Sequence, residues 1–316
     1  MKEEKEGKTE TGEVISSVHK TVLLNETIDG LNLSAKSRAE MTVLDGTFGG
    51  GGHSAEICRK FPGIKIIAID QDKSAFKKAE NKFKGLNCKL SLHNVNFKDL
   101  AEVLKEEGVE KVDGIILDLG LSSDQLENSG RGFSFMKDEP LLMTMKASPT
   151  PEDLTAIDVV NTWEEKNLAD VIYGYGEEKY ARRIAREIVA ARKNKKIETT
   201  FDLVEIIKKA VPVGYQRGRL HFVTRTFQAI RIAVNNELGV LQEGLVNGFE
   251  VLKEGGRMSV ISFHSLEDRI VKNFYKQKVK ESKAVLVNKK PILASDEEQK
   301  DNPRSRSAKL RVLEKI

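Results

Sequence analysis

A run of glycines follows a short apolar segment near the start of the chain. Residues 45–54 read DGTFGGGGHS, with four consecutive glycines from Gly49 to Gly52. Without a Cβ, this backbone can turn sharply and approach a ligand, and a following helix presents free N–H groups to an anion. Asp70 ends the next apolar segment, where a carboxylate accepts hydrogen bonds from ribose hydroxyls. The pattern predicts a nucleotide-cofactor site.

The glycine pattern leaves the kind of cofactor open. Gly50, Gly52 and Ala55 fit a dinucleotide fingerprint, so an NAD-dependent oxidoreductase is a rival interpretation. A P-loop is excluded, because no Gly-Lys-Ser/Thr follows the glycines. A nicotinamide enzyme also needs a proton donor beside its hydride site, and we find no convincing one in the sequence.

A carboxylate also ends a later apolar segment and opens a loop rich in Gly and Ser. Residues 117–126 read LDLGLSSDQL, with Asp118 at the end of the segment. Amine methyltransferases place their transfer chemistry at such a position. The sulfonium of S-adenosylmethionine needs an aligned lone pair, and Asp118 can hold the N–H bonds of a nucleobase amine in that alignment. The alternative is that Asp118 caps a helix or stabilises the loop.

Another polar segment, SFHSLEDR at residues 262–269, follows an apolar run near the C-terminus. Ser265 and Asp268 have the spacing of a capping box, which predicts the start of a helix. His264 then lies at the rim of the sheet, where it can meet substrate or cofactor. The five histidines, at positions 19, 53, 93, 221 and 264, have no metal-ligand spacing, so no metal site is predicted.

Short apolar segments separated by helical patterns must position these residues. Five of them have the composition of buried parallel strands: 41–45, 65–70, 89–93, 112–119 and 256–263. Their alternation with helices predicts an α/β fold with a doubly wound sheet. Two further strands, at 284–293 and 308–316, are expected on either side of an acidic loop.

More than 100 residues separate the fourth strand from the fifth, where a crossover needs about 10–12. A further segment is therefore inserted at the carboxyl end of the fourth strand. Open α/β sheets bind ligands at this edge. Helices are expected there at 155–173, 177–192 and 200–210, and one long amphipathic helix, 227–252, returns to the sheet. The insertion is placed to form one wall of the active site. The alternatives are a decorative insertion or one that forms a homodimer.

Basic residues gather locally although the whole chain is nearly balanced, with 52 Lys and Arg against 48 Asp and Glu. The second inserted helix carries a basic stripe of Lys179, Arg183, Arg186 and Lys193 beside its apolar face. Two more clusters follow: Arg217, Arg219, His221, Arg225 and Arg231, then Arg304, Arg306, Lys309 and Arg311. Three basic clusters around one cleft suit a phosphate backbone, while a solvated helix face is the alternative.

The remaining composition restricts the class of protein. Two cysteines, Cys58 and Cys88, are too few for a disulfide framework and suit a reducing cytosol. No apolar stretch is long enough to span a bilayer, and the N-terminus lacks the apolar core of a secretory signal. We therefore expect a cytoplasmic protein with no membrane partner. Residues 1–17 are expected to form a disordered tail.

The motifs together resemble one family over nearly the whole chain. The matching segments are DGTFGGGGHS, AID, LDLGLSSDQL, RGFSF, YGEE, TRTFQAIRI and SFHSLEDRIVK. They are similar to the bacterial small-subunit ribosomal RNA cytosine-N(4) methyltransferases, the MraW or RsmH family. The resemblance implies a class I S-adenosylmethionine-dependent methyltransferase domain, Rossmann-like, at 18–119 and 218–316. It also implies an inserted helical substrate-recognition domain at 120–217.

The same resemblance implies a reaction and a set of contacts. A methyl group would pass to the exocyclic amine of one cytosine in 16S rRNA near the ribosomal P site, so the partner is this rRNA or the small ribosomal subunit. The residues carried over by motif as cofactor contacts are Gly51, Gly52, His53, Asp70, Phe97, Asp118 and Gln125. Asp118 is also the expected catalytic residue. Without the resemblance, Phe97 would be interpreted as core packing.

One loop departs from the family's pattern. After RGFSF the family usually reads Pro-Leu-Asp-Met-Arg-Met-Asp, whereas this chain has Leu142, Thr144 and Lys146 in place of the two acids and the arginine. A loop that holds the target base or braces the insertion would affect substrate choice or rate. A non-catalytic RNA-binding homologue is therefore the main alternative, ahead of the oxidoreductase.

Overall fold

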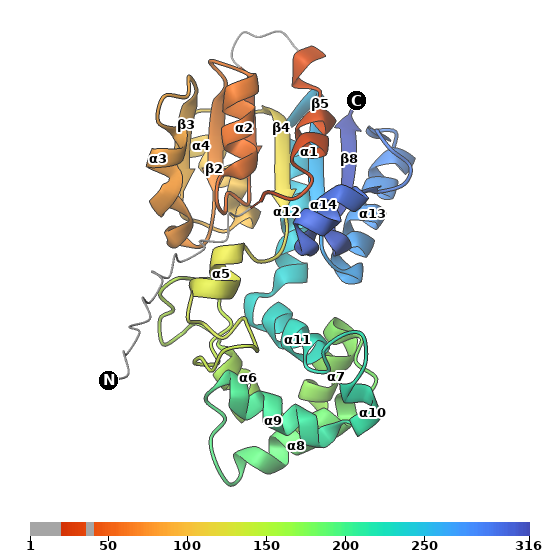
Figure 1. The fold of residues 1–316 in the computed structure, drawn as a ribbon. Helices are drawn as coiled ribbons and strands as arrows, with labels where there is room; N and C mark the ends of the chain where they lie inside the picture. Colours follow the sequence, from red (N-terminus) through yellow and green to blue (C-terminus); the bar gives the residue numbers. More distant parts are fainter. Residues whose placement is uncertain (1–19, 36–40) are drawn as a thin grey trace, which may run out of the picture.

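The computed structural model describes residues 20–35 and 41–316 as a helix-covered sheet above a smaller helical body (Figure 1). The expected tail at residues 1–17 lies outside the described residues. The sheet has the order β3-β2-β1-β4-β5-β8-β6. Its parallel strands are β1 Thr42–Asp45, β2 Lys65–Ile69, β3 Lys89–His93, β4 Val112–Asp118 and β5 Leu252–Ser262. The prediction of a doubly wound parallel sheet is confirmed.

The C-terminal end of the chain completes the sheet. Strand β8, Lys309–Lys315, runs antiparallel to β5. The single strand expected at 284–293 is instead two, β6 Ala284–Leu286 and β7 Ile292–Leu293, and each pairs with β8. Pro291 lies between them and has no N–H for a ladder. The expected acidic loop contains a short helix, α14 Asp296–Asp301, capped by Ser295.

Helices cover both faces of the sheet, because successive residues of a strand point to opposite sides. Ile66 of β2 packs in the cluster with α1, α2 and α3, whereas Ile67 packs in the cluster with α4, α12 and α13. The first group is α1 Leu24–Gly30, α2 Gly52–Lys60 and α3 Ala79–Phe83; the second is α4 Leu100–Glu106, α12 Glu237–Val251 and α13 Ser265–Lys280. Throughout 20–35 and 41–316, helices are too short or too polar to cross a membrane.

The inserted body has a hydrophobic core of its own. Its helices are α5 Ser123–Asn128, α6 Ala156–Thr162, α7 Glu165–Gly176, α8 Ala181–Arg192, α9 Thr200–Ala210, α10 Val213–Gln216 and α11 Thr224–Asn235. The helix predicted at 200–210 is confirmed. The single helix predicted at 155–173 is wrong, because Trp163 adopts an extended ψ of 146° and separates α6 from α7. The helix predicted from 177 begins four residues later, since Glu177 is left-handed with φ 50°.

The long helix predicted at 227–252 is also broken. Asn236 adopts a left-handed conformation, φ 47° and ψ 40°, which ends α11 and precedes α12. Phe227 and Ile230 of α11 pack in the core of the inserted body, while Leu241 and Leu245 of α12 pack against the sheet. The packing therefore changes at Asn236, later along the chain than the boundary at residue 217 expected from the sequence.

The two cysteines are joined by a disulfide, which the sequence analysis did not expect. Cys58 lies on α2, and Cys88 directly precedes β3. The fold brings their Cα atoms to 5.5 Å although 30 positions separate them in the sequence, and this distance is within the range that a disulfide can bridge. The sequence gives the count of cysteines but not this proximity.

Candidate active site

A cavity of about 510 Å³ opens where the carboxyl ends of the parallel strands meet the inserted body. Its sheet side includes Gly49, Gly52, His53, Asp70, Phe97, Asp118, Leu241, His264 and Glu267. Its other wall includes Gln125, Phe133, Phe135, Met143, Met145, Phe227, Gln228 and Arg231. The insertion thus faces the edge of the sheet at which α/β proteins bind ligands.

The structure brings six of the seven expected contact residues to this cavity: Gly52, His53, Asp70, Phe97, Asp118 and Gln125. Gly51 is absent from the wall. It precedes α2 in a left-handed conformation with φ 66°, and a Cβ there would lie 2.6 Å from the ring of Phe48. Gly51 therefore shapes the loop, and a direct contact between Gly51 and a cofactor stays a prediction.

Asp70 holds the glycine loop beside the end of β2. Its Oδ2 accepts a hydrogen bond from the Gly49 N–H at 2.7 Å, and its Oδ1 accepts one from the Asp72 N–H at 2.8 Å. Burial raises the pKa of Asp70 to about 6, although these two hydrogen bonds act in the opposite direction. Each carboxylate oxygen has further lone pairs, so the side chain can still accept hydrogen bonds from a ligand in the cavity.

The first turn of α2 is packed tightly against the N-terminal segment. A Cβ on Gly52 would lie 1.8 Å from Thr21 Oγ1, so no side chain fits at this position. His53 is 5% exposed, and its Nε2 lies 3.2 Å from the carbonyl oxygen of Val22. The glycine thus allows close approach of the backbone, and the neighbouring histidine is fixed by its surroundings.

Asp118 ends β4 and lines the cavity. Its N–H donates to Thr47 Oγ1 at 2.6 Å, and its carboxylate Oδ1 is buried without a hydrogen-bond partner among the described residues. Burial, with the negative charges of Asp45 and Glu267, raises the pKa of Asp118 to about 8. Asp118 does not cap α5, because Ser122 does so. The unpaired oxygen is therefore open to a donor on a ligand.

Phe97 lies in the short turn Phe97–Asp99 that precedes α4. It is partly buried against the core of the sheet, and it also lines the cavity. Two glycines make room for its side chain: a Cβ on Gly244 would lie 2.4 Å from the ring, and one on Gly46 would lie 3.2 Å from the Cβ of Phe97. Both interpretations of Phe97 from the sequence, core packing and a place at the site, are therefore compatible with its position.

Gln125 is held by two partners at the start of α5. Its N–H and side-chain oxygen complete a capping box with Ser122, at 3.1 and 3.0 Å. Its side-chain nitrogen donates to Asp72 Oδ2 at 3.1 Å. The side chain thus connects the inserted body to the turn after β2, and it lines the cavity between them.

A charged cluster that the sequence analysis did not connect lies beside Asp118. Arg231 donates two hydrogen bonds to Glu237, both 2.8 Å long, and His264 Nε2 lies 3.2 Å from Glu267 Oε1. Glu237, His264 and Glu267 have the ligand types of a metal site, but both oxygens of Glu237 are already bonded to Arg231. Only His264 and Glu267 share a segment of the sequence, because Arg231 and Glu237 come from two other helices, α11 and α12.

Two expectations about this region are corrected. The capping box of α13 uses His264 and Glu267 instead of Ser265 and Asp268, because His264 is the last residue with extended backbone, φ −138° and ψ 167°. Arg231 was expected in a phosphate-binding cluster, but it lies in the cavity wall and pairs with Glu237. Arg311 likewise pairs with Asp268 inside the fold, at 2.7 Å.

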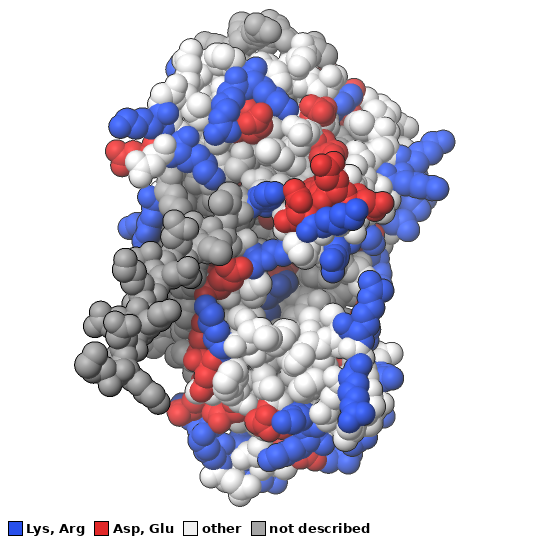
Figure 2. Space-filling model, in the orientation of Figure 1, with Lys and Arg blue, Asp and Glu red and all other residues white. Residues whose placement is uncertain are grey.

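The basic stripe on α8 extends past both ends of the helix, because Lys179 precedes α8 and Lys193 follows it. The stripe is exposed, as expected for either a phosphate-binding or a solvated face. Lys179, Arg183, Arg186 and Lys193 are exposed, and none of them lines the cavity. Lys179 lies over the rings of Tyr180 and Tyr215, 5.1 Å from each centroid. Figure 2 shows Lys and Arg side chains along the inserted body and on both sides of the hollow between the two bodies.

The chain is similar to a described family over almost its whole length. The model of the MraW methylase family matches residues 16–316. Ribosomal RNA small subunit methyltransferase H of Ruminiclostridium cellulolyticum is 46% identical over 94% of this chain and 99% of the relative. The proteins of that name from Acetivibrio thermocellus and Clostridium botulinum are each 47% identical, with the same coverage. An rRNA methylase structure from Streptococcus thermophilus is 12% identical over 92% of this chain and 95% of that chain, with a TM-score of 0.42.

Proposed function

The chain belongs to the MraW methylase family, and from this premise we propose that it methylates 16S rRNA of the small ribosomal subunit. The methyl donor is S-adenosylmethionine, and the acceptor is the exocyclic amine of one cytosine. The observation that carries the proposal is the buried, unpaired Oδ1 of Asp118 in the wall of a cavity that the glycine loop and the inserted body also line.

The residues present fit this cofactor. Asp70 offers carboxylate oxygens to ribose hydroxyls, Gly52 allows close backbone approach, and Phe97 presents an aromatic ring for a base. Gln125 and Asp118 also line the cavity and would face the methionine end. When bound, S-adenosylmethionine supplies an electrophilic methyl group on a sulfonium.

Asp118 serves the acceptor in two steps. Its carboxylate accepts an N–H of the cytosine amine, which aligns the nitrogen lone pair with the methyl carbon. Transfer of the methyl group would leave the amine nitrogen positively charged, and Asp118 would take up the proton that this nitrogen must lose. A carboxylate with a pKa of about 8 is a suitable base for that proton near neutral pH.

The inserted body is proposed to recognise the RNA. Its packing extends to Asn235, so the recognition domain would include α11 beyond the boundary expected at residue 217. The exposed stripe on α8 would contact phosphates. We place the protein in the cytoplasm with its ribosomal substrate, a compartment in which the Cys58–Cys88 disulfide would be open to reduction. The sequence analysis also allows the inserted body to form a homodimer, and this stays a prediction.

The altered loop does not favour a non-catalytic homologue. Arg131 binds this loop through the main-chain carbonyls of Thr144 and Met145, at 3.1 and 2.8 Å. These contacts do not depend on the side chains at the three positions that depart from the family's usual sequence. The loop can therefore keep its place in the cavity wall without the two acids and the arginine.

The proposal is tested with purified protein, small ribosomal subunits lacking the modification, and labelled S-adenosylmethionine. We expect label in one cytosine of 16S rRNA, and a single-turnover rate lowered about 10²-fold or more by Asp118→Ala, the scale for loss of a positioning group. Asp118→Asn keeps one acceptor oxygen and should be milder. Binding of NADH instead of S-adenosylmethionine, or RNA binding with no transfer, would contradict the proposal.

A further inference from the structure

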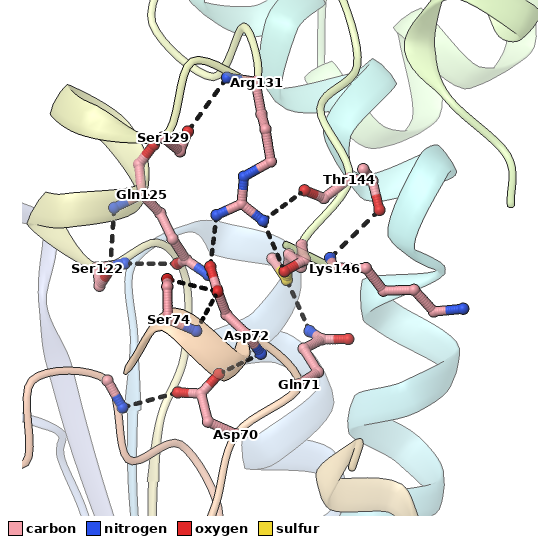
Figure 3. A network of polar contacts seen from close by, with 12 residues as sticks. Asp70, Gln71, Asp72, Ser74, Ser122, Gln125, Ser129, Arg131, Thr144 and Lys146 are labelled. Carbon is pink, nitrogen blue, oxygen red and sulfur yellow. Dashed lines mark hydrogen bonds and ion pairs between the residues drawn. The ribbon is translucent and has the colours of Figure 1, made fainter. Parts of the chain in front are cut away.

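A buried ion pair lies behind the cavity and joins its two walls. The Arg131 guanidinium nitrogen Nη2 donates to Asp72 Oδ2, and the two residues are 5% and 1% exposed. Neither side chain lines the cavity. Asp72 follows β2 in the sheet body, whereas Arg131 belongs to the inserted body, 59 positions later in the sequence. Figure 3 shows the pair at the centre of a polar network between these bodies.

Asp72 holds residues on the proposed cofactor side. Its N–H donates to Asp70 Oδ1 at 2.8 Å, and its Oδ2 accepts from the side-chain nitrogen of Gln125 at 3.1 Å. Its Oδ1 accepts from the N–H and the hydroxyl of Ser74, at 3.0 and 2.6 Å (Figure 3). Burial acts to raise the pKa of Asp72, but the hydrogen bonds from Ser74 and Arg131 outweigh it and keep that pKa low.

Arg131 holds residues on the side of the inserted body. Its guanidinium nitrogen Nη1 donates to the carbonyls of Thr144 and Met145. Its own main-chain carbonyl accepts a hydrogen bond from the Met143 N–H at 2.7 Å. Met143 adopts φ 53°, an unfavourable conformation for a residue with a side chain. Asn235 supports the same loop from the other side, through the Met143 carbonyl and the Met145 N–H, both at 2.8 Å.

We propose that Arg131 and Asp72 are a positioning pair that sets both walls of the active site. Asp72 orients Asp70 and Gln125 toward the cofactor, and Arg131 fixes Met143 and Met145 toward the acceptor base. The planar guanidinium can serve one carboxylate and two carbonyls at once, which a lysine ammonium cannot match. This inference rests on the proposed function, because it assigns the two walls to cofactor and base.

Two substitutions of Arg131 distinguish its contact with Asp72 from its contacts with the loop at Thr144 and Met145. Arg131→Lys keeps a charge beside Asp72 but loses the fork that reaches the loop. We expect its affinity for S-adenosylmethionine to stay within about threefold of wild type, while kcat on small subunits falls about tenfold or more, since small misplacements near reacting atoms are costly. Arg131→Met breaks both contacts and should also weaken the cofactor by about tenfold or more.

Two further variants separate positioning from folding. Arg131→Met leaves Asp72 buried and uncompensated, which destabilises a protein strongly, so Arg131→Met with Asp72→Asn should recover Tm but not kcat. Arg257→Met removes an arginine in the middle of β5 that pairs with Glu314 at 2.7 Å and does not line the cavity. This control should lower Tm and leave cofactor affinity and kcat unchanged.

Calorimetry gives the affinity for S-adenosylmethionine, and steady-state methylation of small subunits gives kcat. If the pair is only structural, the lysine and double variants will have wild-type kcat and affinity per folded molecule, and the inference is overturned. A drop in kcat without a change in affinity for Arg131→Lys supports it. Failure of the wild-type protein to bind S-adenosylmethionine would instead overturn the proposed function itself.

Discussion

Oδ2 of Asp118 lies 3.8 Å from Nδ1 of His53. The other ring nitrogen of His53 lies 3.2 Å from the carbonyl of Val22, which can only accept a hydrogen bond, so the hydrogen of a neutral ring belongs on Nε2. The negative charges of Asp45 and Glu267 also act on the Asp118 carboxyl. Burial is the larger cause, and the pKa of Asp118 reaches about 8 as a result.

The rate of methyl transfer should rise with pH because the proposed step needs the carboxylate form of Asp118. That form is the minor one below a pKa of about 8. Single-turnover rates at saturating S-adenosylmethionine and small subunits should therefore increase from about pH 6.5 toward about pH 8.5. The positive charge of bound S-adenosylmethionine would lower the pKa of Asp118 and move the midpoint of the profile to lower pH. The rate would still increase with pH. Asp118→Asn cannot titrate and should have a flat profile; a flat profile for the wild-type protein contradicts the assignment.

The same shift makes folding stability depend on pH. Between the unfolded pKa of Asp118, about 4, and its folded value of about 8, the folded state binds more protons than the unfolded state. The free energy of unfolding must then fall as pH rises through this range. Asp45 and Asp70, with pKa values raised to about 6, add to the slope only at lower pH.

The window between about pH 7 and about pH 8.5 therefore isolates Asp118. Urea unfolding of the wild-type protein without cofactor should give a lower free energy of unfolding at the upper pH. Asp118→Asn should lose most of this difference, because an amide does not titrate. Equal slopes for the two proteins would mean that other groups cause the dependence.

Asp70 should matter for cofactor affinity. Hydrogen bonds to a charged group contribute roughly 1.5–3 kcal/mol, and each 1.4 kcal/mol is about a factor of ten. Asp70→Ala should thus weaken S-adenosylmethionine by at least about tenfold in calorimetry. Asp70→Asn keeps an acceptor for the Gly49 N–H, so it should retain the loop and lose less affinity. Unchanged affinity for Asp70→Ala would remove this residue from the site.

Gly244 should be intolerant of any side chain because of Phe97. A Cβ at Gly244 would lie 2.4 Å from the Phe97 ring, so Gly244→Ala should displace that ring and weaken S-adenosylmethionine about tenfold or more. Gly174, also inside a helix, has nothing within 4 Å of the position of a Cβ. Gly174→Ala should keep wild-type affinity and raise stability by about 0.4–1 kcal/mol. Equal affinities for the two variants would show that Phe97 does not contact the cofactor.

The sheet could be predicted from the sequence because its signals are local. Each of the strands β1 to β4 is a short, mostly apolar run bounded by polar or glycine residues, and the candidate site residues Asp70 and Asp118 lie where such a run ends. The breaks at Trp163 and Asn236 could not be predicted in this way, since the apolar spacing continues across each of them. Only the separate packing of α11 and α12 makes the second break necessary.

The parts of the site that depend on distant residues were missed for a similar reason. Arg131 and Asp72 are 59 positions apart, and although Arg131 opens the RGFSF segment, nothing in the sequence pairs it with Asp72. In the sequence, Arg231 belongs to a basic cluster that suits phosphate binding. In the structure, its side chain pairs with Glu237. The spacing of residues along the sequence predicts single helices and strands. The Arg131–Asp72 and Arg231–Glu237 pairs form only when the inserted body packs against the sheet body.

The basic stripe on α8 gives the last prediction, which concerns RNA and not the cofactor. Arg183 and Arg186 are exposed on a helix whose opposite face, with Ile184 and Ile188, is buried. If they contact phosphates, log affinity falls by about 0.7–0.9 per phosphate for each tenfold increase in salt. Arg183→Ala with Arg186→Ala should then weaken small-subunit binding and reduce the salt slope by roughly one to two.

A matched variant separates this effect from a general loss of charge. Lys272 and Lys276 are exposed on α13 of the sheet body, and Lys272→Ala with Lys276→Ala removes the same charge. This control should leave the salt slope unchanged, and both double variants should bind S-adenosylmethionine normally. Equal slopes for the two variants would make the stripe a solvated face. Loss of cofactor binding in the α8 variant would mean that the two arginines support the fold, because the stripe lies outside the cavity.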